Sequence, residues 1–285
     1  GILLIAGFIQ PAMVLITFGS AVIVAVSIAI VRHESALHTL TMGAGTVAWL
    51  VGNFIWLGGR PIYQASYWWA GFLLLVIAGE RLELSRVLRL TKRPTTLFGL
   101  AAGLFVLGLL LSLFTYGFGI RLASFGVIDL ALWFGRYDIA RRTIRRPGVT
   151  RYIAWNLLMG YIWLAVSGII GLAYGTLVAG PIYDAWLHAL FLGFAFSMIF
   201  AHALIILPAI LPVKLPFHPV FYLPPILLHI SLFMRIAGDL LLQPSLRQWG
   251  GLLNAVSILL FFFIIIVTVI RSQVNPVQAG KELNP

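Results

Sequence analysis

The sequence predicts an all-α, polytopic integral membrane protein with about nine transmembrane helices, its N-terminus outside and its C-terminus inside. Of the 285 residues, 61% are hydrophobic and only 9% are charged, whereas about a quarter of the residues in soluble proteins carry a charge. Apolar runs of about twenty residues recur along the whole chain, and each could cross a bilayer as a helix. Positive charge is distributed unequally between the two sets of connecting segments, and this inequality gives the orientation.

Nine apolar runs are expected to form the membrane spans. They cover about 4–31, 36–57, 65–80, 96–117, 120–137, 151–178, 183–207, 224–243 and 249–270. In the first run, Pro11 is expected either to kink the helix or to delay its start. In the second run, the small residues from Gly43 to Gly52 predict close contact with another helix rather than a phosphate-binding loop. In the fifth run, the mid-span carboxylate of Asp129 is costly in lipid unless it is paired.

The segment after the seventh run is not expected to form a regular helix, because six prolines lie between Pro208 and Pro225. Residues 1–271 are predicted to form a single transmembrane domain, and residues 272–285 a polar C-terminal tail. The first run is expected to be a retained helix. It lacks the charged start and the small-residue cleavage site of a signal peptide.

The charge distribution sets the orientation. Fifteen of the 19 lysines and arginines fall in connections on one side of the predicted membrane, and only Arg60, Arg121 and Arg247 fall on the other. The positive-inside rule places the first side in the cytoplasm, so the net charge of +11 follows from orientation and indicates no nucleic-acid partner. The chain has no cysteine, which excludes a disulfide framework, an iron–sulfur cluster and a thiolate metal site formed by this chain alone.

Histidines inside the runs are the first candidates for a site, since an imidazole in lipid needs a partner. With the predicted spans, His38, His202 and His229 lie on three helices at about the same depth near the inner surface. Imidazole is a good ligand for haem iron, copper or zinc, so these three predict a haem or metal site. The alternative is that each imidazole forms a hydrogen bond with a neighbouring helix.

His188 stands apart from the other three histidines. It precedes His202 by fourteen residues in the seventh run, which in an unbroken α-helix puts both side chains on nearly one face, about 21 Å apart along the axis. It is expected to lie in the outer part of the membrane, at a depth that no other histidine shares. Its partner is therefore not evident from the sequence.

Two segments resemble a known family. The first runs His38-Thr39-Leu40-Thr41-Met42-Gly43 and continues to Gly59-Arg60-Pro61, and the second is His188-Ala189-Leu190-Phe191-Leu192-Gly193. Both resemble the signature of the NnrS family of haem- and copper-containing bacterial membrane proteins, in which a histidine near a helix start is followed by leucine and glycine. The resemblance implies haem b, possible copper, a multi-pass location in the bacterial inner membrane and a role linked to nitrogen oxides. It also makes His188 a fourth candidate ligand.

A charged pair in the eighth run gives a further prediction. Arg235 lies about ten residues from either end of that run, and Asp239 follows on the same helix face at i+4. Intramembrane charges normally face the protein interior and pair. We expect the two to interact directly or through a shared acidic group, such as a haem propionate or Asp129.

Three functions are compatible with these features. The first is haem b binding in respiratory or nitrogen-oxide-linked electron transfer, with His38, His202 and His229 as ligands and Arg235 near a propionate. The second is a cofactor-free subunit that scaffolds a larger electron-transfer or photosynthetic complex. The third is a small-solute or ion transporter, which Arg235, Asp239 and the proline-rich segment suggest. Each predicts the lipid bilayer as a partner, and the first two also predict other membrane or redox subunits.

Overall fold

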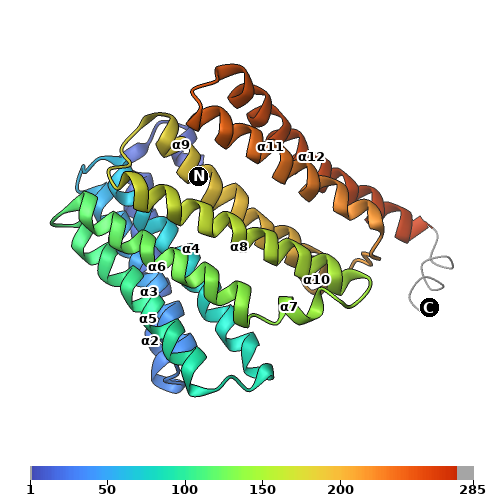
Figure 1. Ribbon diagram of the computed structural model, residues 1–285, viewed down its shortest axis with the longest axis horizontal. Helices are drawn as coiled ribbons and strands as arrows, with labels where there is room; N and C mark the ends of the chain where they lie inside the picture. Colours follow the sequence, from blue (N-terminus) through green and yellow to red (C-terminus); the bar gives the residue numbers. More distant parts are fainter. Residues whose placement is uncertain (1, 275–285) are drawn as a thin grey trace. The chain divides into compact units, whose positions relative to one another are not determined.

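The computed structural model describes residues 2–274, which are all-helical and contain no strand (Figure 1). Nine helices in this part of the chain are long and apolar enough to cross a membrane, as the sequence predicted. They are α2 (Ile9–His33), α3 (Leu37–Leu57), α4 (Ile62–Leu84), α5 (Lys92–Ser112), α6 (Tyr116–Tyr137), α8 (Val149–Tyr174), the continuous helix of α9 (Gly180–His188), η2 (Ala189–Ala195) and α10 (Phe196–Ile210), then α11 (Leu223–Leu240) and α12 (Pro244–Val274). Short helical turns form α1 (Ile2–Ile5), η1 (Ser85–Leu88), α7 (Ala140–Thr143) and η3 (Pro219–Tyr222).

Prolines explain where several helices begin and end. The first long helix starts late, at Ile9, with Pro11 in its first turn, where a missing N–H costs nothing. In the proline-rich segment, Pro208 lies inside α10, and the chain then leaves helical geometry until η3. At its far end, Pro224 and Pro225 occupy the first turn of α11. At the C-terminus, α12 continues to Val274, and the rest of the predicted polar tail lies outside the described residues.

The structure divides into two compact units, which are described separately. Unit 1 consists of Gly1–Ile139 with Ser167–Gly180, and unit 2 of Ala140–Val166 with Pro181–Pro285. Helix α8 contributes residues to both. The single transmembrane domain predicted for residues 1–271 therefore stays a prediction.

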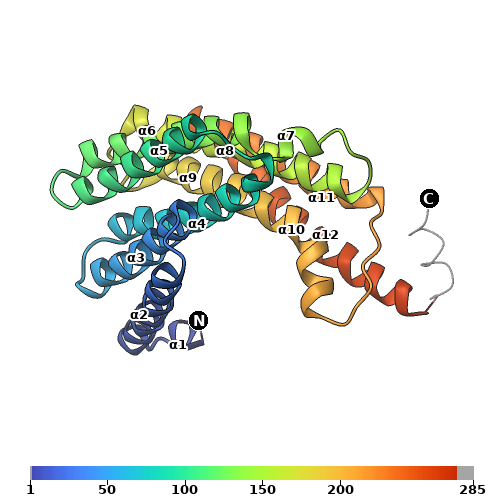
Figure 2. The same cartoon turned by 90° about the horizontal axis from the view of Figure 1, so that it is seen from below.

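Unit 1 is built from helices that follow one another along the chain and pack as neighbours. Helix α3 packs against both α2 and α4, and α5 packs against α6 (Figure 2). The glycines of α3 allow the approach to α4: a Cβ at Gly45 would lie 3.0 Å from the carbonyl oxygen of Phe72, and one at Gly52 would lie 2.8 Å from Trp69 Cδ1. The prediction of close helix contact along this stretch is confirmed.

A series of two hydrogen bonds, one buried and one partly buried, joins the first three long helices of unit 1. Trp69 Nε1 on α4 donates to Asn53 Oδ1 on α3 at 2.9 Å, and Asn53 Nδ2 donates to Ser20 Oγ on α2 at 2.9 Å. Each of these groups would be costly in lipid without a partner. The chain of bonds therefore fixes the order in which the three helices pack.

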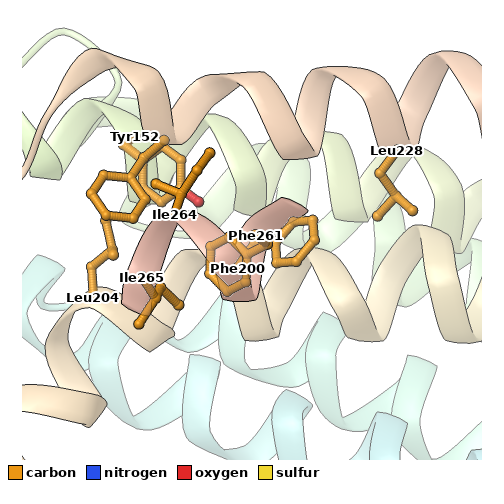
Figure 3. Packing of buried hydrophobic residues seen from close by; sticks show 8 residues of the cluster. Tyr152, Phe200, Leu204, Leu228, Phe261, Ile264 and Ile265 are labelled. Carbon is orange, nitrogen blue, oxygen red and sulfur yellow. The ribbon is translucent and has the colours of Figure 1, made fainter. Parts of the chain in front are cut away.

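Unit 2 has an aromatic core. Its buried residues come from α8, α10, η3, α11 and α12, and several of them are drawn in Figure 3. They are Tyr152, Phe200, Leu204, Phe221, Leu228, Phe261, Ile264 and Ile265. The rings of Phe200 and Phe261 approach to 4.3 Å between centroids. This core holds α10 against α12, while α11 and α12 run side by side along much of their length (Figure 1).

Candidate functional site

Unit 2 carries a cluster of ionisable side chains on three helices. Asp184 and His188 come from α9, Arg235 and Asp239 from α11, and Arg247 from α12. We call these five residues the charged cluster. Asp184 follows the start of α9, Asp239 precedes the end of α11 and Arg247 follows the start of α12, so the cluster forms where these helix ends meet.

Two arginines and two aspartates form a continuous series of ion pairs. Two nitrogens of Arg235 donate hydrogen bonds to Asp184 Oδ2: Nη2 at 2.9 Å and Nε at 3.2 Å. Arg247 continues the series, with Nη2 3.5 Å from Asp184 Oδ2 and Nε 2.9 Å from Asp239 Oδ1. With a neutral His188 the cluster has no net charge, which is the arrangement that charges need when they are removed from water.

Arg235 and Asp239 are therefore linked indirectly, through residues that the sequence analysis did not identify. The shared acidic group is Asp184, which was not a candidate, and Arg247 completes the link to Asp239. The expected position of Arg235, about ten residues from either end of its helix, is also wrong. Helix α11 ends at Leu240, where a turn with a positive φ of 54° at Leu242 begins, so Arg235 lies five residues from the helix end.

A glycine makes room for the Arg235 guanidinium. A Cβ at Gly251 on α12 would lie against Arg235 Nη1, and a Cβ at Gly250 would lie 2.8 Å from Arg235 Cα. The two glycines therefore let α12 approach α11 closely at this point. They leave the space in which the guanidinium turns towards Asp184.

His188 also finds its partner in this cluster. Its Nδ1 lies 2.8 Å from the backbone carbonyl oxygen of Asp184 and 3.4 Å from Asp184 Oδ1. Because a carbonyl oxygen only accepts, Nδ1 carries the proton. His188 thus contacts both the backbone and the side chain of Asp184, the aspartate that both arginines bind.

A π-helix separates His188 from His202 and changes their relation. Residues Ala189–Ala195 form η2, whose hydrogen bonds reach one residue further than those of an α-helix. This adds about one residue to the turn and rotates the two histidines by roughly 100° relative to an unbroken helix. The expectation that both lie on one face, which assumed regular helix, does not hold. Such π-helical turns are frequent at functional sites.

A cavity of about 520 Å³ opens beside the charged cluster. Arg235, Asp239, Arg247 and Gln248 line it together with apolar residues, among them Leu242. The Asp239 side chain is 0% exposed, and neither carboxylate oxygen accepts a hydrogen bond within the described structure. Arg247 neutralises Asp239 by charge, at 2.9 Å, without satisfying its oxygens. A buried carboxylate that accepts no hydrogen bond costs free energy, so Asp239 is the group in this cluster with the greatest need of a further donor.

The predicted haem and metal ligands have different surroundings. His202 Nδ1 lies 2.7 Å from the Met198 carbonyl oxygen, which fixes its proton on Nδ1 and its lone pair on Nε2, the arrangement of a ligating histidine. In contrast, His229 Nδ1 accepts a hydrogen bond from Trp163 Nε1 at 3.0 Å. Its Nε2 therefore carries the proton and is a donor, which does not suit a metal ligand.

His38 and the remaining candidates complete this comparison. His38 is buried at the start of α3, with Nε2 3.7 Å from Glu34 Oε1. Among residues 2–274, no group of three or more His, Cys, Asp or Glu side chains is arranged to hold a metal ion. His38 belongs to unit 1 and the other two to unit 2, so a site shared by all three stays a prediction.

Two cluster residues were missed at the level of sequence. Asp184 lies four residues before His188, a spacing that places two side chains together on a helix and could have signalled the pair. Arg247 was counted only as an outer-loop charge. Its role depends on how α12 packs against α11, which no local pattern reports.

The comparison with known families covers both units. The family model for a domain of unknown function, DUF8744, matches residues 1–270. The chain belongs to the DUF8744 family. No curated protein and no solved structure matches it. The matched range includes the whole charged cluster of this DUF8744 chain, whereas its resemblance to the NnrS family stays a prediction.

Proposed function

We propose that this DUF8744 chain is a multi-pass transporter of the bacterial inner membrane that binds a small charged solute in the cavity beside the charged cluster. The observation that carries this proposal is the Asp239 carboxylate, which is buried beside the cavity with Arg235 and Arg247 and accepts no hydrogen bond from the described residues. The positive-inside distribution supports a cytoplasmic C-terminus and, with it, a cavity at the outer side.

The chemistry of the cavity favours a solute that carries both a donor and an acceptor. Asp239 offers acceptor oxygens, and the Arg247 side chain, which is 42% exposed, offers guanidinium donors. A small zwitterion would satisfy both groups and leave the cavity neutral. The volume of about 520 Å³ lies within the range of small-molecule sites. Charges that are costly to keep in a membrane typically mark the path of a solute or an ion.

Binding and uptake of small zwitterions test the proposal. The purified protein would be screened with a panel of amino acids, amines and carboxylates by thermal shift, and each stabilising compound would be followed as a radiolabelled solute into proteoliposomes. We expect at least one zwitterion to stabilise the wild type and to be taken up. Asp239→Asn should reduce uptake by about tenfold or more, because a lost charged hydrogen bond is worth about 1.5–3 kcal/mol. The matched control Glu83→Gln changes an exposed carboxylate in unit 1 and should leave uptake intact.

Two outcomes would contradict transport through this cavity. The first is a wild type that neither binds nor accumulates any member of the panel. The second is an Asp239→Asn variant that keeps full uptake and loses only thermal stability, which would make the charged cluster a structural element.

Haem b binding in respiratory or nitrogen-oxide-linked electron transfer is a second candidate function, and the ring orientation of His202 favours it. The His229 tautomer opposes that residue as a ligand, and Asp184 already binds the guanidinium predicted to hold a propionate. An absorption spectrum of protein purified from haem-supplied cells shows whether the chain binds haem. A Soret band that His202→Ala removes and His33→Ala retains would support haem, and copper analysis of the same sample would test the second metal. A featureless spectrum would leave the transporter or a cofactor-free scaffold subunit.

A further inference from the structure

Unit 1 contains a groove that the proposed transport function does not use. It has a volume of about 410 Å³, and its lining includes Phe54, Ile55, Arg60, Gln64 and Leu113. We call it the Arg60 groove. Its wall follows the last turns of α3 from Val51 to Gly58, a length of about 10 Å.

One end of the Arg60 groove is polar and lacks a protein partner. Arg60 is exposed in the turn after α3, and its guanidinium forms no ion pair or hydrogen bond with the described residues. The Gln64 side chain, one turn into α4, has no such partner either. The other two cations assigned to the outer side differ, since Arg121 donates to the Tyr174 carbonyl oxygen and Arg247 pairs with Asp184 and Asp239.

Most of the remaining lining of the groove is apolar, with Ser112 and Tyr116 as its other polar residues. The side chains of Phe54 and Leu113 are 57% and 44% exposed, and Ile55 is half-buried. In a membrane, such exposed apolar side chains contact acyl chains. An unpaired guanidinium at the end of an apolar groove is complementary to an anion that carries a hydrocarbon chain.

We propose that the Arg60 groove binds one anionic phospholipid. Arg60 and Gln64 hold its phosphate, and Phe54, Ile55 and Leu113 contact its acyl chain. The occupant is a lipid rather than a free phosphate because Arg60 and the apolar side chains line one groove, and only a molecule with both an anionic group and a hydrocarbon chain contacts both. The proposal is independent of the transport function, since every residue that carries it belongs to unit 1.

Native mass spectrometry of the delipidated protein in detergent, titrated with phosphatidylglycerol or phosphatidylcholine, tests the inference. We expect a saturable one-lipid adduct that favours phosphatidylglycerol. Arg60→Gln should weaken this adduct about tenfold, whereas Arg60→Lys should keep most of the affinity. The control Arg93→Gln removes one exposed positive charge elsewhere in unit 1 and should change nothing. Leu113→Trp should fill the groove and lower the affinity while leaving the charge in place.

Three outcomes would contradict the proposed lipid site. Equal weakening by Arg60→Gln and Arg93→Gln would reduce the effect to overall charge and overturn the site. Equal binding of the two lipids would remove the selectivity for an anion and overturn it too. Displacement of phosphatidylglycerol by millimolar inorganic phosphate, with no effect of Leu113→Trp, would identify a free-anion site instead of a lipid site. Melting temperatures measured without lipid would show that each variant is folded.

Discussion

Replacing Arg235 with leucine is expected to lower the free energy of unfolding by about 2–3 kcal/mol. The substitution removes the hydrogen bonds that two Arg235 nitrogens donate to Asp184 and leaves that carboxylate with Arg247 at 3.5 Å and His188 Nδ1 at 3.4 Å. Breaking a fully buried pair costs about 3–5 kcal/mol. The expected loss is smaller here because both side chains of the pair are 19% exposed and Arg247 remains nearby. Unfolding in mixed detergent micelles measures the change.

A second substitution identifies the partner. Adding Asp184→Leu to Arg235→Leu should recover a large part of the loss, because the stranded carboxylate is removed with its cation. Adding Asp239→Leu instead should recover less, because Arg247, rather than Arg235, neutralises Asp239 and would have to move from 3.5 Å to pair closely with Asp184. Recovery with Asp239→Leu and none with Asp184→Leu would contradict the observed pairing and restore the i, i+4 pair that the sequence suggests.

The contrast between these two double variants shows what the sequence could and could not predict at the site. The i, i+4 spacing of Arg235 and Asp239 correctly placed both on one helix face, and the cost of charge in lipid correctly required partners. The spacing did not predict that Arg235 would turn towards a different helix. That choice depends on the space left by Gly251 and on the approach of α9, which are properties of tertiary packing.

The fold was more predictable than the site, for a physical reason. A span must bury about twenty apolar residues, so hydropathy alone gives the nine long helices. Local features that leave the hydropathy unchanged were missed. The π-helix at Ala189–Ala195 changes which face His188 presents, and the Trp163 hydrogen bond decides which nitrogen of His229 carries the proton. Neither depends on how apolar the segment is.

The aromatic core of unit 2 gives the other large expected effect, which a pair of adjacent phenylalanines on α12 can isolate. Phe261 is 1% exposed, with its ring centroid 4.3 Å from that of Phe200, whereas Phe262 is 51% exposed. In a membrane, moving apolar surface from lipid into protein brings no hydrophobic gain, so the packing of Phe261 is what distinguishes it from the exposed Phe262. Phe261→Ala removes about 100 Å³ of side chain, and at about 24 cal/mol per Å³ of cavity the expected loss is about 2–3 kcal/mol.

Phe262→Ala is the matched control, because it makes the same chemical change one residue further along the same helix. It should change the free energy of unfolding by less than about 0.5 kcal/mol, as is usual for substitutions away from packed interiors. Both variants would be unfolded in the same mixed micelles as the Arg235 series. Equal losses at the two positions would mean that Phe261 packs no more tightly than a lipid-facing residue, and α12 would then not be held by the Phe200 contact. A large loss at Phe261 alone would show that ring packing, independent of the charged cluster, fixes α12 against α10.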